Sequence, residues 1–343
     1  MSPRRDRTLL WALRSPCNLA CDYCYFGTLE EHRETPPTQP GQLSHLPHGD
    51  LPLSTITRFL STAGDSGIGR VFLAGGEPLI WTGTPTVLRL LREAGIETTV
   101  CTNGVPLNRD HVRATLAEHA VGAVSVSLDS LDPAVNDSHR SARNHKDGWR
   151  TVVSGLRALL DDPAHTDTRV AVCTVISRHT LPTLAATAAF AADLGVHYFV
   201  PQPISLAHDH PLHAELSLRP EDVDTVTTVL DRVHREFGDR LALPAPAYTR
   251  QIASTITTHH QSVRSSFGGA RLAFVQPDGS VWDCPSAYRI TATVGTHRSI
   301  ATATAADLFP AGPTGDGREC GVFSRDCVSM WPLMDFPALT GTT

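Results

Sequence analysis

Apolar residues along the first two thirds of the chain follow two alternating patterns. Short segments rich in apolar residues, such as residues 70–76 and 122–130, predict strands, and the nearly continuous apolar run at residues 70–76 predicts a buried one. Between such runs, segments such as residues 84–95 and 148–160 carry apolar residues at helical spacing. This regular alternation is typical of βα units arranged around a parallel sheet.

Six strands and six helices follow from these patterns. We expect the strands at residues 8–14, 70–76, 97–104, 122–130, 169–177 and 197–204. We expect the helices at residues 53–64, 84–95, 108–119, 148–160, 181–195 and 219–238. Ser54 is the expected N-cap of the first helix. Repeated units of this kind form either a doubly wound sheet or an incomplete barrel.

The pattern changes after residue 240. Residues 271–284 predict a β-hairpin whose turn is formed by residues 277–279, Pro-Asp-Gly. Residues 315–331 show no periodicity and predict a loop. We therefore divide the chain into a βα core at residues 1–240 and a small module at residues 241–343.

Composition and charge exclude several classes of protein. Hydrophobic residues make up 41% of the chain and charged residues 19%, as in ordinary globular proteins. The formal net charge of −6 gives no reason to expect a nucleic-acid partner. The chain has no apolar run of about 18 residues that would span a membrane, and no export signal is evident. We expect a cytoplasmic protein, where eight cysteines favour metal ligands or catalytic thiols over disulfides.

Three cysteines, Cys17, Cys21 and Cys24, lie close together just after the first expected strand. In parallel βα folds the carboxyl ends of the strands form the active-site face. Thiolates suit zinc and iron–sulfur clusters, but zinc normally takes four ligands and no fourth Cys or His lies at zinc-finger spacing. A [4Fe–4S] cluster held by three cysteines leaves one iron available to a small molecule.

The sequence around these cysteines, CNLACDYCYF, resembles the C-x3-C-x-aromatic-C signature of radical S-adenosylmethionine (SAM) enzymes, with Tyr23 at the aromatic position. Three further motifs follow in the order typical of this family, each at the end of an expected strand. They are GGEP (Gly75, Gly76, Glu77, Pro78), TNG (Thr102, Asn103, Gly104) and SLDS (Ser127 to Ser130). The match covers roughly residues 8–205 and implies a partial (β/α)6 barrel of the TIM type.

The resemblance implies a set of cofactors and roles. Cys17, Cys21 and Cys24 would hold a [4Fe–4S] cluster, and SAM would chelate its open iron. An electron from an external flavodoxin or ferredoxin type of donor would cleave SAM to a 5′-deoxyadenosyl radical, which takes hydrogen from the substrate. The residues expected to bind SAM are Tyr23, Gly75, Gly76, Glu77, Pro78, Thr102, Asn103, Ser127, Asp129 and Arg140.

Two of these residues have specific expected partners. Ser127 is a candidate for the SAM ribose and Arg140 for its carboxylate, because a guanidinium binds carboxylates through two parallel bonds. The alternative for Arg140 is a solvated loop charge. The family often has Arg-Gly here, whereas this chain has Arg140-Ser141.

A second group of cysteines lies near the C-terminus. The spacing from Gly279 to Cys284 resembles the hairpin of SPASM and twitch modules, which bind auxiliary [4Fe–4S] clusters, and Cys320 and Cys327 follow. Three cysteines of the seven in a full SPASM pattern allow at most one auxiliary cluster. The alternative is free thiols, one of them a hydrogen-atom donor. Within the predicted strands, we expect Cys101 to pack in the core, while Cys173 is a candidate to face the substrate.

These features favour a radical SAM enzyme that modifies a specialised metabolite. The cysteine motif begins at residue 17 without a preceding peptide-recognition domain, which favours a polar small molecule such as an aminocyclitol, amino sugar or nucleoside. A peptide substrate stays open. Two-electron oxidation through the auxiliary cluster is favoured over epimerisation with Cys284 or Cys173 as hydrogen donor, and over peptide crosslinking. A non-catalytic iron–sulfur protein is the alternative from another class, but it would need no SAM motifs.

Overall fold

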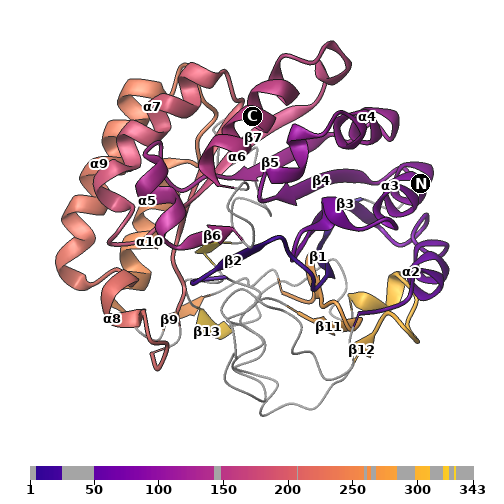
Figure 1. Cartoon of the computed structure of the whole chain (residues 1–343). Coiled ribbons are helices and arrows are strands. Elements are labelled where there is room, and N and C mark those ends of the chain that lie inside the picture. The colour runs from indigo at the N-terminus through magenta and orange to yellow at the C-terminus, as the bar shows by residue number, and fades with distance from the viewer. Residues whose placement is uncertain are drawn as a thin grey trace.

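A single sheet of nine strands organises the chain, with helices on its outer side (Figure 1). The computed structural model describes residues 5–24, 50–142, 148–206, 208–258, 261–263, 268–283, 298–309, 320–323 and 328–329. The strand order is β12-β11-β10-β1-β3-β4-β5-β7-β8. The six strands of the barrel pair in parallel, and they are β1 (Arg7–Arg14), β3 (Ile68–Gly75), β4 (Glu97–Thr102), β5 (Ala123–Ser127), β7 (Arg169–Ile176) and β8 (Tyr198–Pro203).

These six strands confirm the predicted ones and resolve the open choice of architecture in favour of a partial barrel. The predicted helices are also confirmed, as α2 (Leu53–Leu60), α3 (Thr84–Glu93), α4 (Asp110–Glu118), α6 (Trp149–Leu160), α7 (Leu184–Leu194) and α9 (Val223–Phe237). Three more helices are α5 (Pro133–Ser138), α8 (His213–Leu216) and α10 (Pro246–Thr257).

The start of α2 differs from the expectation. Pro52 occupies the N-cap position with an extended backbone, and the helix begins at Leu53. Ser54 therefore lies inside the first turn and does not cap the helix. An N-cap at Ser54 would start the helix at residue 55, two residues later than the observed start at Leu53.

The two faces of each barrel strand differ in character. On β1, Leu9, Trp11 and Leu13 are buried against the helical layer, and the Trp11 ring meets Phe59 of α2 edge-on at a centroid distance of 5.7 Å. The opposite faces of β4 and β5 carry small polar side chains toward the barrel axis, Thr99 and Ser125 among them. A TIM-type barrel interior is normally filled by bulky branched side chains, so small side chains here leave room for a ligand.

The chain after residue 240 joins this sheet. Strand β10 (Leu272–Val275) pairs in parallel with β1, and β11 (Ser280–Trp282) returns antiparallel to β10. This confirms the predicted hairpin, with Gly279 in its turn at a φ of +83°. Beyond it, β12 (Arg298–Ser299) pairs with β11. The division into two domains at residue 240 stays a prediction.

One short strand lies where the sequence predicted only a loop. Strand β13 (Cys320–Phe323) pairs antiparallel with β9 (Gln261–Val263). Pairing of two short segments satisfies their backbone hydrogen-bonding groups without any periodic pattern in either, which is why the strand was not expected.

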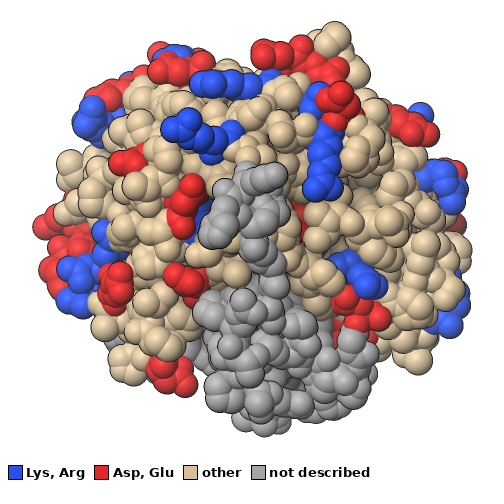
Figure 2. Space-filling view, viewed as in Figure 1, with Lys and Arg blue, Asp and Glu red and all other residues tan. Residues whose placement is uncertain are grey.

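On the face seen in Figure 2, acidic and basic side chains of the described residues are interspersed and do not merge into a basic patch. Among the residues that the structure places, no helix combines the length and the apolar character needed to cross a membrane.

Candidate active site

A cavity of about 530 Å3 lies inside the barrel and reaches the carboxyl ends of its strands. Most of the predicted site residues line this one cavity. They are Cys17, Cys21, Tyr23, Cys24, Gly75, Gly76, Thr102, Asn103, Ser127, Asp129, Arg140 and Cys173. Glu77 and Pro78 are buried close by, in the turn that follows β3.

The three clustered cysteines form part of the cavity wall. Cys21 ends the short strand β2 (Leu19–Cys21), and the Cys24 N–H donates to the Cys21 carbonyl at 3.2 Å. All three thiols are partly exposed. Burial raises the pKa of Cys17 to about 11 and that of Cys21 to about 12, so both thiols hold their protons near neutral pH in the metal-free protein. Three cysteines in one cavity wall match the number of ligands of a cubane cluster that keeps one iron open.

The glycines of GGEP allow two backbone segments to meet. A Cβ atom on Gly76 would lie 2.3 Å from the carbonyl oxygens of both Ser15 and Pro16. Gly75 has a φ of +115°, which side chains rarely tolerate, and a Cβ atom there would also meet backbone. The turn after β3 is therefore packed directly on the loop that leads into Cys17.

Glu77 connects this turn to the end of β4. Its side chain is fully buried and accepts hydrogen bonds from the Leu79 N–H at 3.0 Å, the Thr102 hydroxyl at 2.9 Å and the Asn103 N–H at 2.7 Å. Burial raises the pKa of Glu77 to about 7, against these hydrogen bonds, which lower it. The Asn103 side-chain amide in turn lies 3.7 Å from the Cys17 Sγ, so Glu77 helps to fix a neighbour of the cysteines.

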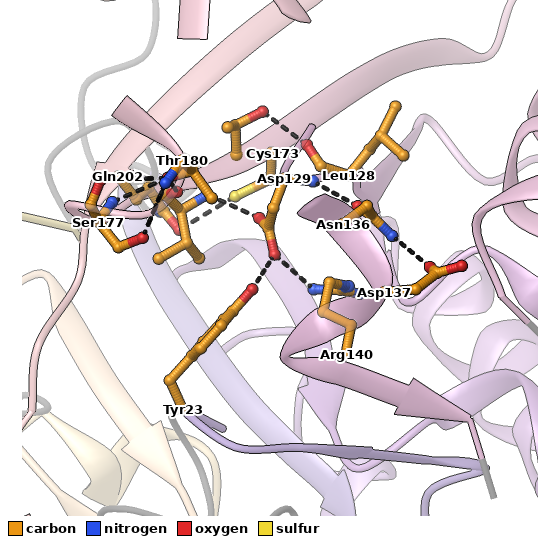
Figure 3. Close-up of polar contacts among 12 residues, drawn as sticks. Tyr23, Leu128, Asp129, Asn136, Asp137, Arg140, Cys173, Ser177, Thr180 and Gln202 are labelled. Atoms are coloured by element: carbon orange, nitrogen blue, oxygen red, sulfur yellow. Dashed lines mark hydrogen bonds and ion pairs between the residues drawn. The ribbon is translucent and has the colours of Figure 1, made fainter. Parts of the chain in front are cut away.

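Asp129 gathers residues from three parts of the chain (Figure 3). Its Oδ2 accepts hydrogen bonds from the Tyr23 hydroxyl and from Arg140 Nη1, the latter at 3.1 Å. Its Oδ1 accepts from the Val175 N–H at 2.8 Å. Tyr23, Asp129 and Arg140 are all buried, so Arg140 is not the solvated loop charge that the sequence left open.

The strand pairing near Arg140 adds a second connection. Strand β6 (Arg140–Ala142) runs antiparallel to β2, with Arg140 opposite Cys21. The Asp22 N–H also donates to the His139 carbonyl at 2.9 Å. The segment that carries the three cysteines, residues 17–24, is called the cysteine loop below. It is thus attached to the segment that follows α5.

The two strand cysteines both line the cavity. The Cys173 thiol donates to Gln202 Oε1 at 3.1 Å, and Gln202 Nε2 donates to the Ser329 carbonyl at 2.8 Å. Cys101 was expected in the core, but it is only partly buried and faces the cavity beside Thr99. The reason is the alternation of β4, which turns Val100 outward to the helices and its neighbour inward.

Gln202 and Ser329 were not predicted from sequence. For Gln202 a signal existed, because the two-residue alternation along β8 places it on the same face as Val200, which also lines the cavity. For Ser329 there was none, because its place depends on how the C-terminal segment folds back. Cys284 and Cys327 lie outside the described residues, and only the backbone of Cys320 is described, so the auxiliary cluster stays a prediction.

The fold places three cysteines in the wall of a cavity at the mouth of a partial βα barrel. The family model of the radical SAM superfamily matches residues 16–191, half of the chain. The chain belongs to the radical SAM superfamily, and its cofactors are the [4Fe–4S] cluster and SAM of that superfamily.

Several characterised proteins have similar sequences. The AdoMet-dependent heme synthase of Methanosarcina barkeri is 23% identical over 293 residues, which cover 81% of this chain and 76% of that protein. The S-adenosylmethionine-dependent nucleotide dehydratase of Lacinutrix mariniflava is 28% identical over 37% of this chain, but the match spans only 24% of that protein. The GTP 3′,8-cyclase of Chlorobaculum tepidum is 29% identical over 45% of this chain and 41% of its own length.

Two solved structures share the fold. SuiB of Streptococcus suis, bound to S-adenosylmethionine, aligns with a TM-score of 0.60 and 14% identity over 90% of this chain and 65% of SuiB. AnSMEcpe with bound AdoMet aligns with a TM-score of 0.62 and 17% identity over 88% of this chain and 80% of that chain. At these identities the similarity concerns the fold.

Proposed function

We propose that this chain is a radical SAM enzyme that oxidises a polar small molecule by two electrons. Cys17, Cys21 and Cys24 would hold the cluster, and Arg140 would bind the SAM carboxylate. When bound, cluster and SAM supply a 5′-deoxyadenosyl radical that takes a hydrogen atom from a substrate. One observation carries the proposal: the three thiols and the hollow barrel interior share a single cavity.

Part of the cavity lining suits a polar ligand. Thr99 and Ser125, on the inward faces of β4 and β5, offer hydroxyl groups to a ligand inside the barrel. The volume of about 530 Å3 lies in the range of small-molecule sites, typically ~300–1,000 Å3. An aminocyclitol, amino sugar or nucleoside has the hydroxyl and amino groups that such a wall can bind. A peptide side chain is the alternative.

The chain's own residues would orient and protect the reactants. Ser127 lines the cavity at the end of β5, and it would contact the SAM ribose. The walls of the cavity would exclude water from a bound substrate. Water would otherwise compete for the hydrogen bonds that the substrate makes with the protein. For an oxidation, Cys284, Cys320 and Cys327 would supply a second cluster as electron acceptor.

Epimerisation is a second candidate because of one observation. The Cys173 thiol lies in the cavity, and burial raises its pKa, so it keeps the hydrogen that a donor needs. In this case the thiol would return a hydrogen atom to the substrate carbon, and the substrate mass would not change. The thiyl radical left behind would take one electron from the external donor and one proton from solvent to become a thiol again.

A solvent-isotope experiment separates the two reactions. The reconstituted, reduced enzyme is incubated with SAM and panels of aminocyclitols, amino sugars and nucleosides in D2O. Oxidation predicts a product two hydrogens lighter, with no deuterium at the reacting carbon. A product of the substrate's constitution that carries one non-exchangeable deuterium, and loses it in the Cys173→Ala variant, would establish epimerisation instead.

A further inference from the structure

The Asp129 carboxylate is almost fully occupied by protein groups. Three hydrogen bonds reach it, from Tyr23, Arg140 and Val175, and a carboxylate offers roughly four acceptor positions. Only 1% of the residue is exposed. Its backbone N–H is also held, by the Asn136 side-chain oxygen at 3.0 Å. Although Asp129 lies at the cavity wall, little of its binding capacity is left for a ligand.

The groups bound at Oδ2 come from two different functional segments. Tyr23 belongs to the cysteine loop and precedes Cys24 directly. Arg140 begins β6, where it is opposite Cys21 in the two-stranded ladder. The Asp129 Oδ2 atom therefore connects two segments (Figure 3). Through Tyr23 it contacts the loop that would hold the cluster, and through Arg140 it contacts the cation that would bind the SAM carboxylate.

The charges make this junction sensitive to substitution. Asp129 and Arg140 form an ion pair in which the two side chains are 1% and 8% exposed. Loss of one partner from a buried pair leaves the other charge without compensation, which is costly. A neutral amide at position 129 would keep the shape but lose the charge, and its NH2 group cannot accept a hydrogen bond.

We propose that Asp129 is a positioning residue that couples cluster retention to SAM binding. It orients Tyr23, and with it the cysteine loop, and it orients Arg140 toward the cofactor; it is not itself a ligand of SAM. This inference rests on the proposed function, in that Cys17, Cys21 and Cys24 hold the cluster.

The test compares three variants in two measurements that do not require turnover. Cluster retention is the rate at which a chelator removes iron under anaerobic conditions, and SAM affinity is measured by equilibrium dialysis at equal iron content. Tyr23→Phe should accelerate iron loss about tenfold and leave SAM affinity within about twofold. Arg140→Gln should weaken SAM binding about tenfold and accelerate iron loss about threefold, because the uncompensated Asp129 carboxylate holds Tyr23 less firmly. Tenfold corresponds to about 1.4 kcal/mol, the scale of one hydrogen bond to a charged group.

Asp129→Asn should change both iron loss and SAM affinity about tenfold, because the Asp129 carboxylate accepts the hydrogen bonds of both Tyr23 and Arg140. Asp162→Asn is the matched control. Its carboxylate accepts a hydrogen bond from the Ala164 N–H at 3.0 Å and pairs with Arg113 at 3.6 Å, and it is not part of the cavity lining. This control should change neither quantity by more than about twofold.

Several results would overturn the inference. Weaker SAM binding with normal iron retention in Asp129→Asn would make Asp129 a simple SAM contact. Equal effects in Asp162→Asn would reduce the role of Asp129 to general stability. If Asp129→Asn does not fold, the Tyr23→Phe/Arg140→Gln double variant decides. Coupling through Asp129 predicts iron loss no faster than in Tyr23→Phe alone, because the bond through which Arg140 acts on the cysteine loop is already absent, and a simple product of the single effects refutes it. A wild-type protein that holds iron and binds SAM without cleaving it would refute the proposed function, while this pattern would still be measurable.

Discussion

Replacing Glu77 by Gln removes a titratable group from the contact between the turn after β3 and the end of β4. The side chain is fully buried and accepts hydrogen bonds from Thr102 and Asn103. Burial raises its pKa from 4.5 to about 7 in the folded protein. The Glu77→Gln variant keeps a similar shape but stays neutral at every pH of interest.

The sign and size of the effect follow from this pKa difference. A raised folded-state pKa means that the contribution of Glu77 to stability is fully present below about pH 4.5 and is lost as the pH rises through about 7. The full difference, 7 minus 4.5, is about 2.5 pKa units or roughly 3.4 kcal/mol at ~1.36 kcal/mol per unit. Between about pH 5 and about pH 8, roughly 2.5 kcal/mol of this is lost.

The assay is urea unfolding of the metal-free protein under reducing conditions at these two pH values. From the lower to the higher pH, wild type should lose about 2.5 kcal/mol more stability than Glu77→Gln, whatever the variant costs at a single pH. Glu93→Gln, at an exposed position of α3, is the control and should follow wild type. Equal pH dependence of wild type and Glu77→Gln would refute the reasoning that burial governs this carboxylate.

Two further predictions concern the cysteine loop and the C-terminal module. Gly76→Ala should prevent stable cluster loading, because the new Cβ atom would lie 2.3 Å from two backbone carbonyl oxygens. Gly64→Ala should load normally, because no atom lies within 4 Å of a Cβ at that position. The iron content of both variants checks this, and normal loading of Gly76→Ala would contradict the packing argument. Wild type should bind about eight irons per chain, as two four-iron clusters, and Cys284→Ala about four; a wild-type content near four would exclude the auxiliary cluster.

The sequence predicted the barrel because each of its strands is a local pattern. Residues 70–76 and 169–177 are apolar runs bounded by turn or polar residues, and the structure has β3 and β7 there within two residues. The site motifs were equally visible, since each is a short segment at a strand end. Parallel strands bring such ends together, so the motifs had to meet at one edge of the barrel.

What could not be predicted depends on contacts between distant segments. Tyr23 and Asp129 are 106 positions apart, and no local pattern indicates that the hydroxyl reaches that carboxylate. The same holds for Gln202 and Ser329, which are 127 positions apart. Cys101 was misplaced for a different reason: a cysteine in a buried strand fits either face, and only the register of β4 decides between core and cavity.

The formation of 5′-deoxyadenosine tests the central claim most directly. Protein reconstituted anaerobically with iron and sulfide, then reduced in the presence of SAM, should produce 5′-deoxyadenosine and methionine. Cys21→Ala should lose this activity together with about four irons, whereas Cys101→Ala, whose thiol lies outside the proposed ligand set, should keep its iron. Wild-type protein that carries the cluster and binds SAM, yet forms no 5′-deoxyadenosine on reduction, would contradict the account.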